Sequence, residues 1–112
     1  MKIYHNPRCS KSRGALSLLE EKGIVVEIIK YLEDIPNAEE LKDVLKKLGM
    51  KAEDIVRKGE KDYKENFKGK ILSEDEWITA LIKYPKLIER PIVVKGDRAV
   101  VGRPVENILD LI

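Results

Sequence analysis

The chain has 112 residues, with 22 basic and 20 acidic side chains and a formal net charge of +2. A hydrophobic share of 43% argues against a disordered chain, and the balanced charge argues against a nucleic-acid partner. The apolar runs are too short to cross a membrane, so neither a membrane protein nor a membrane partner is expected.

The first third of the chain predicts a strand, a helix and a second strand. Residues 3–5 form a short apolar run that ends at the turn signal Asn6-Pro7. Apolar residues then recur at helical spacing up to Gly23, where a C-terminal cap belongs. The β-branched run 24–31 predicts the second strand and completes a βαβ unit.

The middle of the chain predicts two capped helices. The first, over residues 37–49, begins at an Asn/Glu capping box and ends at a glycine. The second, over residues 73–85, begins at a Ser/Glu capping box and is stopped by a proline. Its apolar stripe includes Trp77 and Tyr84, which this spacing places in a core rather than on a base-stacking surface.

The last third predicts a hairpin and a closing helix. The β-rich runs 91–94 and 98–101 are joined by a Lys-Gly-Asp turn. Pro104 suits the first turn of the closing helix. The apolar stripe expected on that helix consists of Val105, Ile108, Leu109 and Ile112.

This order of elements predicts the fold class. A βαβ unit supplies parallel strands and the hairpin supplies antiparallel ones, so we expect an α/β fold with a mixed four-stranded sheet and flanking helices. In a chain of this length the arrangement is thioredoxin-like. The middle helices form an insertion between the βαβ unit and the C-terminal ββα unit. We expect one domain over residues 1–112.

Cys9 is the strongest candidate for a reactive group. It lies between the first strand and the first helix, where unpaired backbone N–H groups and the helix dipole favour the thiolate. Arg8, Lys11 and Arg13 add positive charge, and the thiolate is the nucleophilic form. The alternative is that Cys9 is a small buried hydrophobic residue. The turn and the three cations favour a nucleophile.

Cys9 is also the only cysteine, since Ser12 stands where a Cys-x-x-Cys motif would have its second thiol. Redox turnover therefore needs an outside thiol such as glutathione, glutaredoxin or thioredoxin. Ser12 either hydrogen-bonds the thiolate or caps the helix. One cysteine and one histidine are too few for a structural metal site. A lone thiol without an evident export signal predicts a cytoplasmic protein.

Three arginines stand near a glycine or proline at predicted element boundaries: Arg57, Arg90 and Arg103. Singly, each suits a solvated surface charge. Together with a thiolate at a helix N-terminus, they predict a site for a tetrahedral oxyanion held by bidentate guanidinium contacts.

These residues carry a family resemblance. The segment Tyr4-His5-Asn6-Pro7-x-Cys9-x-x-Ser12-Arg13 resembles the active-site segment of the glutaredoxin-coupled arsenate reductases, the ArsC type. The similarity is collinear over essentially the whole chain. It continues through Tyr31-Leu32, Arg57-Lys58, Arg90-Pro91-Ile92-Val93-Val94 and Gly102-Arg103-Pro104.

The resemblance implies a set of catalytic residues. Cys9 would attack arsenate and carry the arsenic as a thiolate adduct, and His5 would help to keep Cys9 ionised. Ser12 matches the segment around the nucleophile and would support it. The fold implied is the same thioredoxin-like one, with a helical insertion.

The resemblance also implies the ligands and the electron source. Arg57, Arg90 and Arg103 would bind the oxyanion through the cycle, and Arg13 would support them. Glutathione and glutaredoxin would supply the electrons, with glutathione as a co-substrate and no cofactor tightly bound. Arsenite would be the product, and we expect a monomer.

Two alternatives come from other classes of protein. Spx-type regulators, which bind RNA polymerase, share the fold but usually carry Cys-x-x-Cys, whereas Ser12 occupies the second position here. A monothiol oxidoreductase acting on glutathione mixed disulfides would use Cys9 in the same way and leave the arginines incidental.

Overall fold

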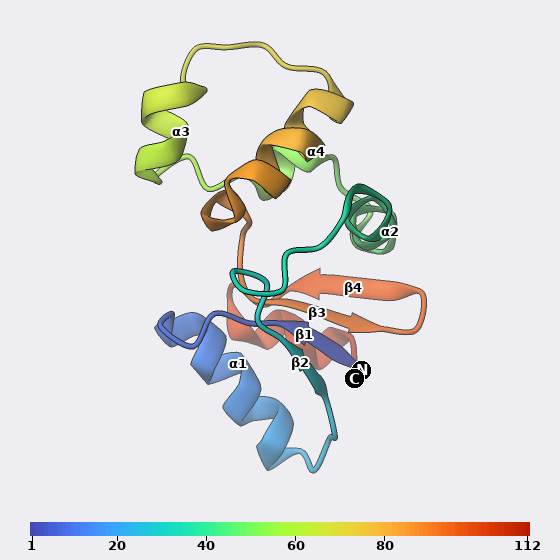
Figure 1. The fold of residues 1–112 in the computed structure, drawn as a ribbon. Helices are drawn as coiled ribbons and strands as arrows, with labels where there is room; N and C mark the ends of the chain where they lie inside the picture. Colours follow the sequence, from blue (N-terminus) through green and yellow to red (C-terminus); the bar gives the residue numbers. More distant parts are fainter. The chain divides into compact units, whose positions relative to one another are not determined.

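The computed structural model describes all 112 residues, which fold as two compact units. The first unit joins Met1–Asp34 to Arg90–Ile112, and the second is Ile35–Glu89. The strands belong to the first unit, and the second is helical (Figure 1). No helix has the length and apolar character needed to span a membrane. A single domain over residues 1–112 stays a prediction.

A mixed four-stranded sheet forms the centre of the first unit, with the strand order β2-β1-β3-β4 (Figure 1). Strand β1 pairs parallel with β2 and antiparallel with β3, which pairs antiparallel with β4. This confirms the predicted mixed sheet. The strands are β1 (Lys2–Tyr4), β2 (Glu27–Ile29), β3 (Ile92–Lys95) and β4 (Arg98–Val101).

Strand β2 is shorter than the strand predicted over the β-branched run 24–31. Its only partner is β1, which ends at Tyr4 before the Asn6-Pro7 turn, so the pairing reaches no further than Ile29. Val25 lies outside the strand and is 93% exposed. The β-branched run is therefore longer than the segment of β1 that is available to pair with it.

One face of the sheet packs against α1 (Ser10–Glu21) and the 3₁₀-helix η3 (Val105–Asp110). The βαβ order around α1 agrees with the prediction from sequence. The buried cluster between sheet and helices consists of Ile3, Ala15, Leu19, Val93, Ile108 and Leu111.

The closing segment is a 3₁₀-helix rather than an α-helix, and this changes its buried face. Ile108 and Leu111 are buried, whereas Leu109 and Ile112 are 46% and 36% exposed. A 3₁₀-helix has about three residues per turn, so Val105 shares a face with Ile108 and Leu111. The predicted stripe assumed α-helical spacing and was wrong at Leu109 and Ile112.

The second unit contains α2 (Ala38–Leu48), η1 (Ala52–Ile55), α3 (Lys61–Asn66), α4 (Glu74–Lys83) and η2 (Pro85–Leu87). Helices α2 and α4 confirm the two helices predicted from their caps. Helix α3 was not predicted, because it buries no residue and so has no apolar stripe to reveal it.

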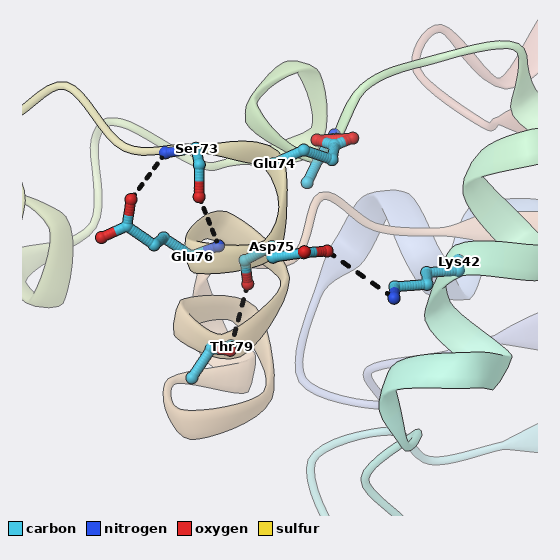
Figure 2. Close-up of polar contacts among 7 residues, drawn as sticks. Lys42, Ser73, Glu74, Asp75, Glu76 and Thr79 are labelled. Carbon is cyan, nitrogen blue, oxygen red and sulfur yellow. Dashed lines mark hydrogen bonds and ion pairs between the residues drawn. The ribbon is translucent and has the colours of Figure 1, made fainter.

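The sequence signals at the helix ends form the expected hydrogen bonds. The Asn37 side chain accepts the N–H of Glu40 at 2.8 Å, and Gly49 ends α2 with a φ of +69°. At α4 the bonds are reciprocal, as Figure 2 shows. The Glu76 N–H donates to Ser73 Oγ at 3.2 Å, and the Ser73 N–H donates to Glu76 Oε1 at 3.0 Å.

Helix α4 contacts both α2 and η1 within the second unit. Its first turn reaches α2 through Asp75, whose carboxylate lies 3.6 Å from Nζ of Lys42 (Figure 2). The Glu74 carboxylate accepts the N–H of Ala52 in η1 at 2.7 Å. Trp77 on the apolar side of α4 is buried as predicted, whereas Tyr84, the residue after the helix, is only half-buried.

The 3₁₀ geometry of η3 makes a testable prediction about stability. Leu111→Ala removes a buried side chain and should lower the free energy of unfolding by about 2–5 kcal/mol. Leu109→Ala, the matched control two residues away, should cost only about 0.5 kcal/mol because Leu109 is half exposed. Urea unfolding followed by circular dichroism measures both. Equal losses of unfolding free energy in the two variants would contradict the burial of Leu111 and the exposure of Leu109.

Candidate active site

The topology brings four strand ends to one edge of the sheet. Tyr4, at the carboxyl end of β1, pairs with Ile29 at the end of β2 and with Ile92 at the start of β3. Ile92 in turn pairs with Val101 at the end of β4. The segments that follow β1, precede β3 and follow β4 therefore meet at this edge, although they are far apart in the sequence.

Cys9 lies at this edge as the residue that precedes α1. Its backbone is extended, with φ −93° and ψ 122°, and its N–H donates to the Asn6 carbonyl at 3.0 Å. This bond closes a turn between β1 and the helix. The thiol therefore faces the first turn of α1, whose N–H groups have no partner within the helix.

The Cys9 thiol is half-buried and has a pKa of about 7, below its ordinary 9.0. Partial burial raises the pKa, but hydrogen bonds to the sulfur outweigh it. These bonds come from the Ser12 N–H, the Arg103 and Arg90 side chains, and the Lys11 N–H. Arg103 Nη2 lies 3.5 Å from Sγ. The lowered pKa increases the share of nucleophilic thiolate near neutral pH.

Arg90 and Arg103 are linked to each other as well as to the sulfur. Arg103 Nε donates to the Arg90 carbonyl at 2.7 Å, and both arginines precede a cis-proline. Beside them, the Gly102 N–H donates to the Pro91 carbonyl at 2.8 Å. A Cβ at Gly102 would lie 2.9 Å from a Pro91 side-chain carbon. Glycine at this position therefore permits the close approach that carries Arg103 to the thiol.

His5 and Ser12 form a buried pair behind the nucleophile. His5 Nδ1 and Ser12 Oγ are hydrogen-bonded at 2.6 Å, and Ser12 Oγ also accepts the N–H of Asn6 at 3.0 Å. Burial lowers the pKa of His5, and the charges of Lys30 and Arg13 lower it further, which favours the neutral ring. His5 therefore fixes the position of Ser12 through its hydroxyl group, and the backbone N–H of Ser12 hydrogen-bonds the Cys9 sulfur.

Asn6 is a site residue that sequence analysis missed. Its N–H donates to Ser12 of α1, its carbonyl accepts the N–H of Cys9, and its Oδ1 accepts the N–H of Arg8 at 3.0 Å. Asn6 is 8% exposed, so these bonds replace water contacts. Asparagine before proline was interpreted only as a turn, although its side chain can bond a backbone N–H two residues on.

Two of the predicted anion-binding arginines, Arg13 and Arg57, form hydrogen bonds with backbone carbonyls. The exposed Arg13 donates from Nη1 to the Pro7 carbonyl at 3.0 Å and so ties α1 to the loop. Arg57 belongs to the second unit, where its N–H donates to the Leu87 carbonyl at 2.7 Å. Substrate binding by Arg13 and Arg57 stays a prediction.

A cysteine of lowered pKa directly before the first helix, beside a mixed four-stranded sheet, places the chain in the thioredoxin-like class of thiol proteins. The sequence model of the ArsC family matches residues 4–111, so the chain belongs to that family. The family resemblance found in the sequence is thus confirmed.

Individual relatives agree with this assignment. An arsenate reductase of Neisseria meningitidis serogroup A is 50% identical over 110 residues, which are 96% of this chain and 94% of that protein. The uncharacterized protein YfgD of Escherichia coli is 49% identical, with coverage of 100% and 96%. The structure of an arsenate reductase from Vibrio cholerae has a TM-score of 0.94 at 47% identity, with coverage of 100% and 98%. These neighbours confirm the predicted thioredoxin-like fold.

The bonds to the sulfur predict its titration. Alkylation of Cys9 by iodoacetamide should accelerate with rising pH around a midpoint near 7, because only the thiolate reacts. Arg103→Ala removes a cation at 3.5 Å and should move the midpoint upward, toward 9.0. Arg98→Ala is the matched control, since exposed Arg98 bonds the Asp110 carbonyl and should leave the midpoint at 7. A midpoint unmoved by Arg103→Ala would contradict this account.

Proposed function

We propose that this protein is a thiol-dependent oxidoreductase that reduces arsenate to arsenite, with Cys9 as the nucleophile. The observation that carries the proposal is the Cys9 thiol, whose pKa of about 7 comes with a guanidinium 3.5 Å from the sulfur. Similarity at 50% identity to a protein named arsenate reductase supports the choice of oxyanion.

The first step forms a bond between sulfur and arsenic. The Cys9 thiolate attacks the arsenic of arsenate, an As–O bond breaks, and the oxygen leaves as water after protonation. Arsenic stays pentavalent in this adduct. Arg90 and Arg103 neutralise its negative oxygens, because guanidinium remains charged and can bind two oxygens at once.

The second step transfers two electrons. The sulfur of glutathione bonds to the sulfur of Cys9, the electron pair of the S–As bond stays on arsenic, and trivalent arsenite leaves. Glutaredoxin then cleaves the resulting Cys9–glutathione disulfide and restores the thiol. Overall, arsenate and two thiols give arsenite, one disulfide and water. The outside thiols are necessary because the chain has a single cysteine.

Arg57 is the third proposed anion ligand. Its place at a predicted element boundary and the family resemblance both suggest this role.

Coupled turnover tests the proposal. With glutathione, glutaredoxin, glutathione reductase and NADPH, the wild-type protein should consume NADPH in an arsenate-dependent reaction. Cys9→Ser should abolish this activity, and Arg103→Ala should lower kcat/KM for arsenate by about 10²–10³. Arg98→Ala, which removes the same charge from the hairpin, is expected to stay near wild type. A wild-type rate no higher than that of Cys9→Ser would refute the proposal.

The same variants separate arsenate reduction from the monothiol alternative. A glutathione-dependent oxidoreductase acting on mixed disulfides would need Cys9 but no anion ligand. Release of glutathione from a glutathionylated substrate that persists in Arg90→Ala, without arsenate turnover in the wild type, would favour that alternative.

A further inference from the structure

A pocket of about 530 Å³ lies within the second unit, between α4 and the segment that follows α3. Small-molecule sites usually have volumes of about 300–1,000 Å³, so this pocket is large enough for one. Its lining begins at Asn66 and ends at Tyr84, and no residue of the Cys9 site contributes to it. We propose that the pocket binds a small aromatic anion, meaning a flat apolar ring that carries a carboxylate or a similar acidic group.

The apolar part of the pocket is largely aromatic. Phe67 and Tyr84 line it, and their rings meet edge to face with centroids 5.6 Å apart. The Phe67 ring also lies 5.6 Å from the ring of Trp77, which is buried. Phe67 and Tyr84 are only partly buried, so they leave ring surface open to a ligand. Since aromatic rings pack well edge to face or offset against other rings, this surface favours a flat ring.

The cations of the pocket are two lysines without an anionic partner. Lys70 follows α3, and Lys83 is the last residue of α4. Neither forms an ion pair within the chain. Lys83 Nζ lies 5.5 Å from the centre of the Tyr84 ring, which places a cation beside the aromatic surface. A ring packed against Tyr84 therefore has an ammonium group near its edge, where an acidic substituent can pair with it.

The two carboxylates that line the pocket, in contrast, already have partners. Asp75 points toward α2, where its carboxylate lies 3.6 Å from Lys42 Nζ (Figure 2). Glu76 Oε1 accepts the N–H of Ser73 in the capping box at the start of α4 (Figure 2). The charges left without a partner are thus the two positive ones, and they favour an anionic ligand over a cationic one.

Binding of 2-naphthoate tests the proposal, with 2-naphthamide as a neutral compound of nearly the same shape. The chain has a single tryptophan, so ¹⁵N-labelled protein gives one indole N–H signal, which reports on the aromatic cluster. Titration with naphthoate should shift this signal and the amides of residues 66–84. Naphthamide should bind about fivefold more weakly, because it cannot form an ion pair with a lysine.

Two double variants test the role of the lysines. Lys70→Gln with Lys83→Gln removes both cations of the pocket and should raise the Kd for naphthoate about tenfold. Lys64→Gln with Lys68→Gln is the matched control, since it removes the same charge from exposed positions of the second unit that do not line the pocket. Because salt screens charges outside the contact, this control should stay within about twofold of wild type.

Four results would overturn the proposal: no saturable shift with naphthoate, shifts confined to residues outside 66–84, equal Kd values for naphthoate and naphthamide, or equal Kd values for the two double variants. The measurement uses neither Cys9 nor arsenate. Its outcome is therefore independent of the proposed function, and each can fail without the other.

Discussion

The site depends on a competition between burial and hydrogen bonding at the Cys9 sulfur. Partial burial favours the neutral thiol, while N–H groups of the first turn of α1 and the guanidinium groups of Arg90 and Arg103 favour the thiolate. The hydrogen bonds prevail, which leaves a pKa of about 7. Because guanidinium stays charged throughout the physiological range, the same arginines can stabilise the thiolate first and a bound oxyanion afterwards. The nucleophile and its proposed substrate thus rely on the same charges.

The strand directions make this arrangement possible. Strand β1 is antiparallel to β3, and β3 is antiparallel to β4, so the end of β1 lies beside the start of β3 and the end of β4. Cys9 and Arg103 follow β1 and β4, and Arg90 precedes β3. The parallel neighbour β2 ends at this edge too and adds Lys30 beside His5. A single sheet edge therefore holds the nucleophile and two cations.

Signals local in sequence predicted much of the fold. The caps at Asn37 and Ser73 located α2 and α4, and the turn before a helix singled out Cys9. Leu109 was misplaced because a short segment with apolar residues at several spacings does not distinguish α from 3₁₀ geometry. The contact of Arg103 with the thiol joins residues 94 positions apart, so it depends on tertiary structure. Their positions beside glycine or proline at element boundaries, together with the family resemblance, indicated which arginines to consider.

Protection of Cys9 by the anion tests the central claim most directly. At pH 7 the rate of iodoacetamide alkylation should fall as arsenate is added, because the anion and the adduct both occupy the sulfur's surroundings. Arg103→Ala should abolish most of this protection, whereas Arg98→Ala should retain it. A Cys9 that is alkylated at the same rate with and without saturating arsenate would contradict an oxyanion site built on the Cys9 thiolate.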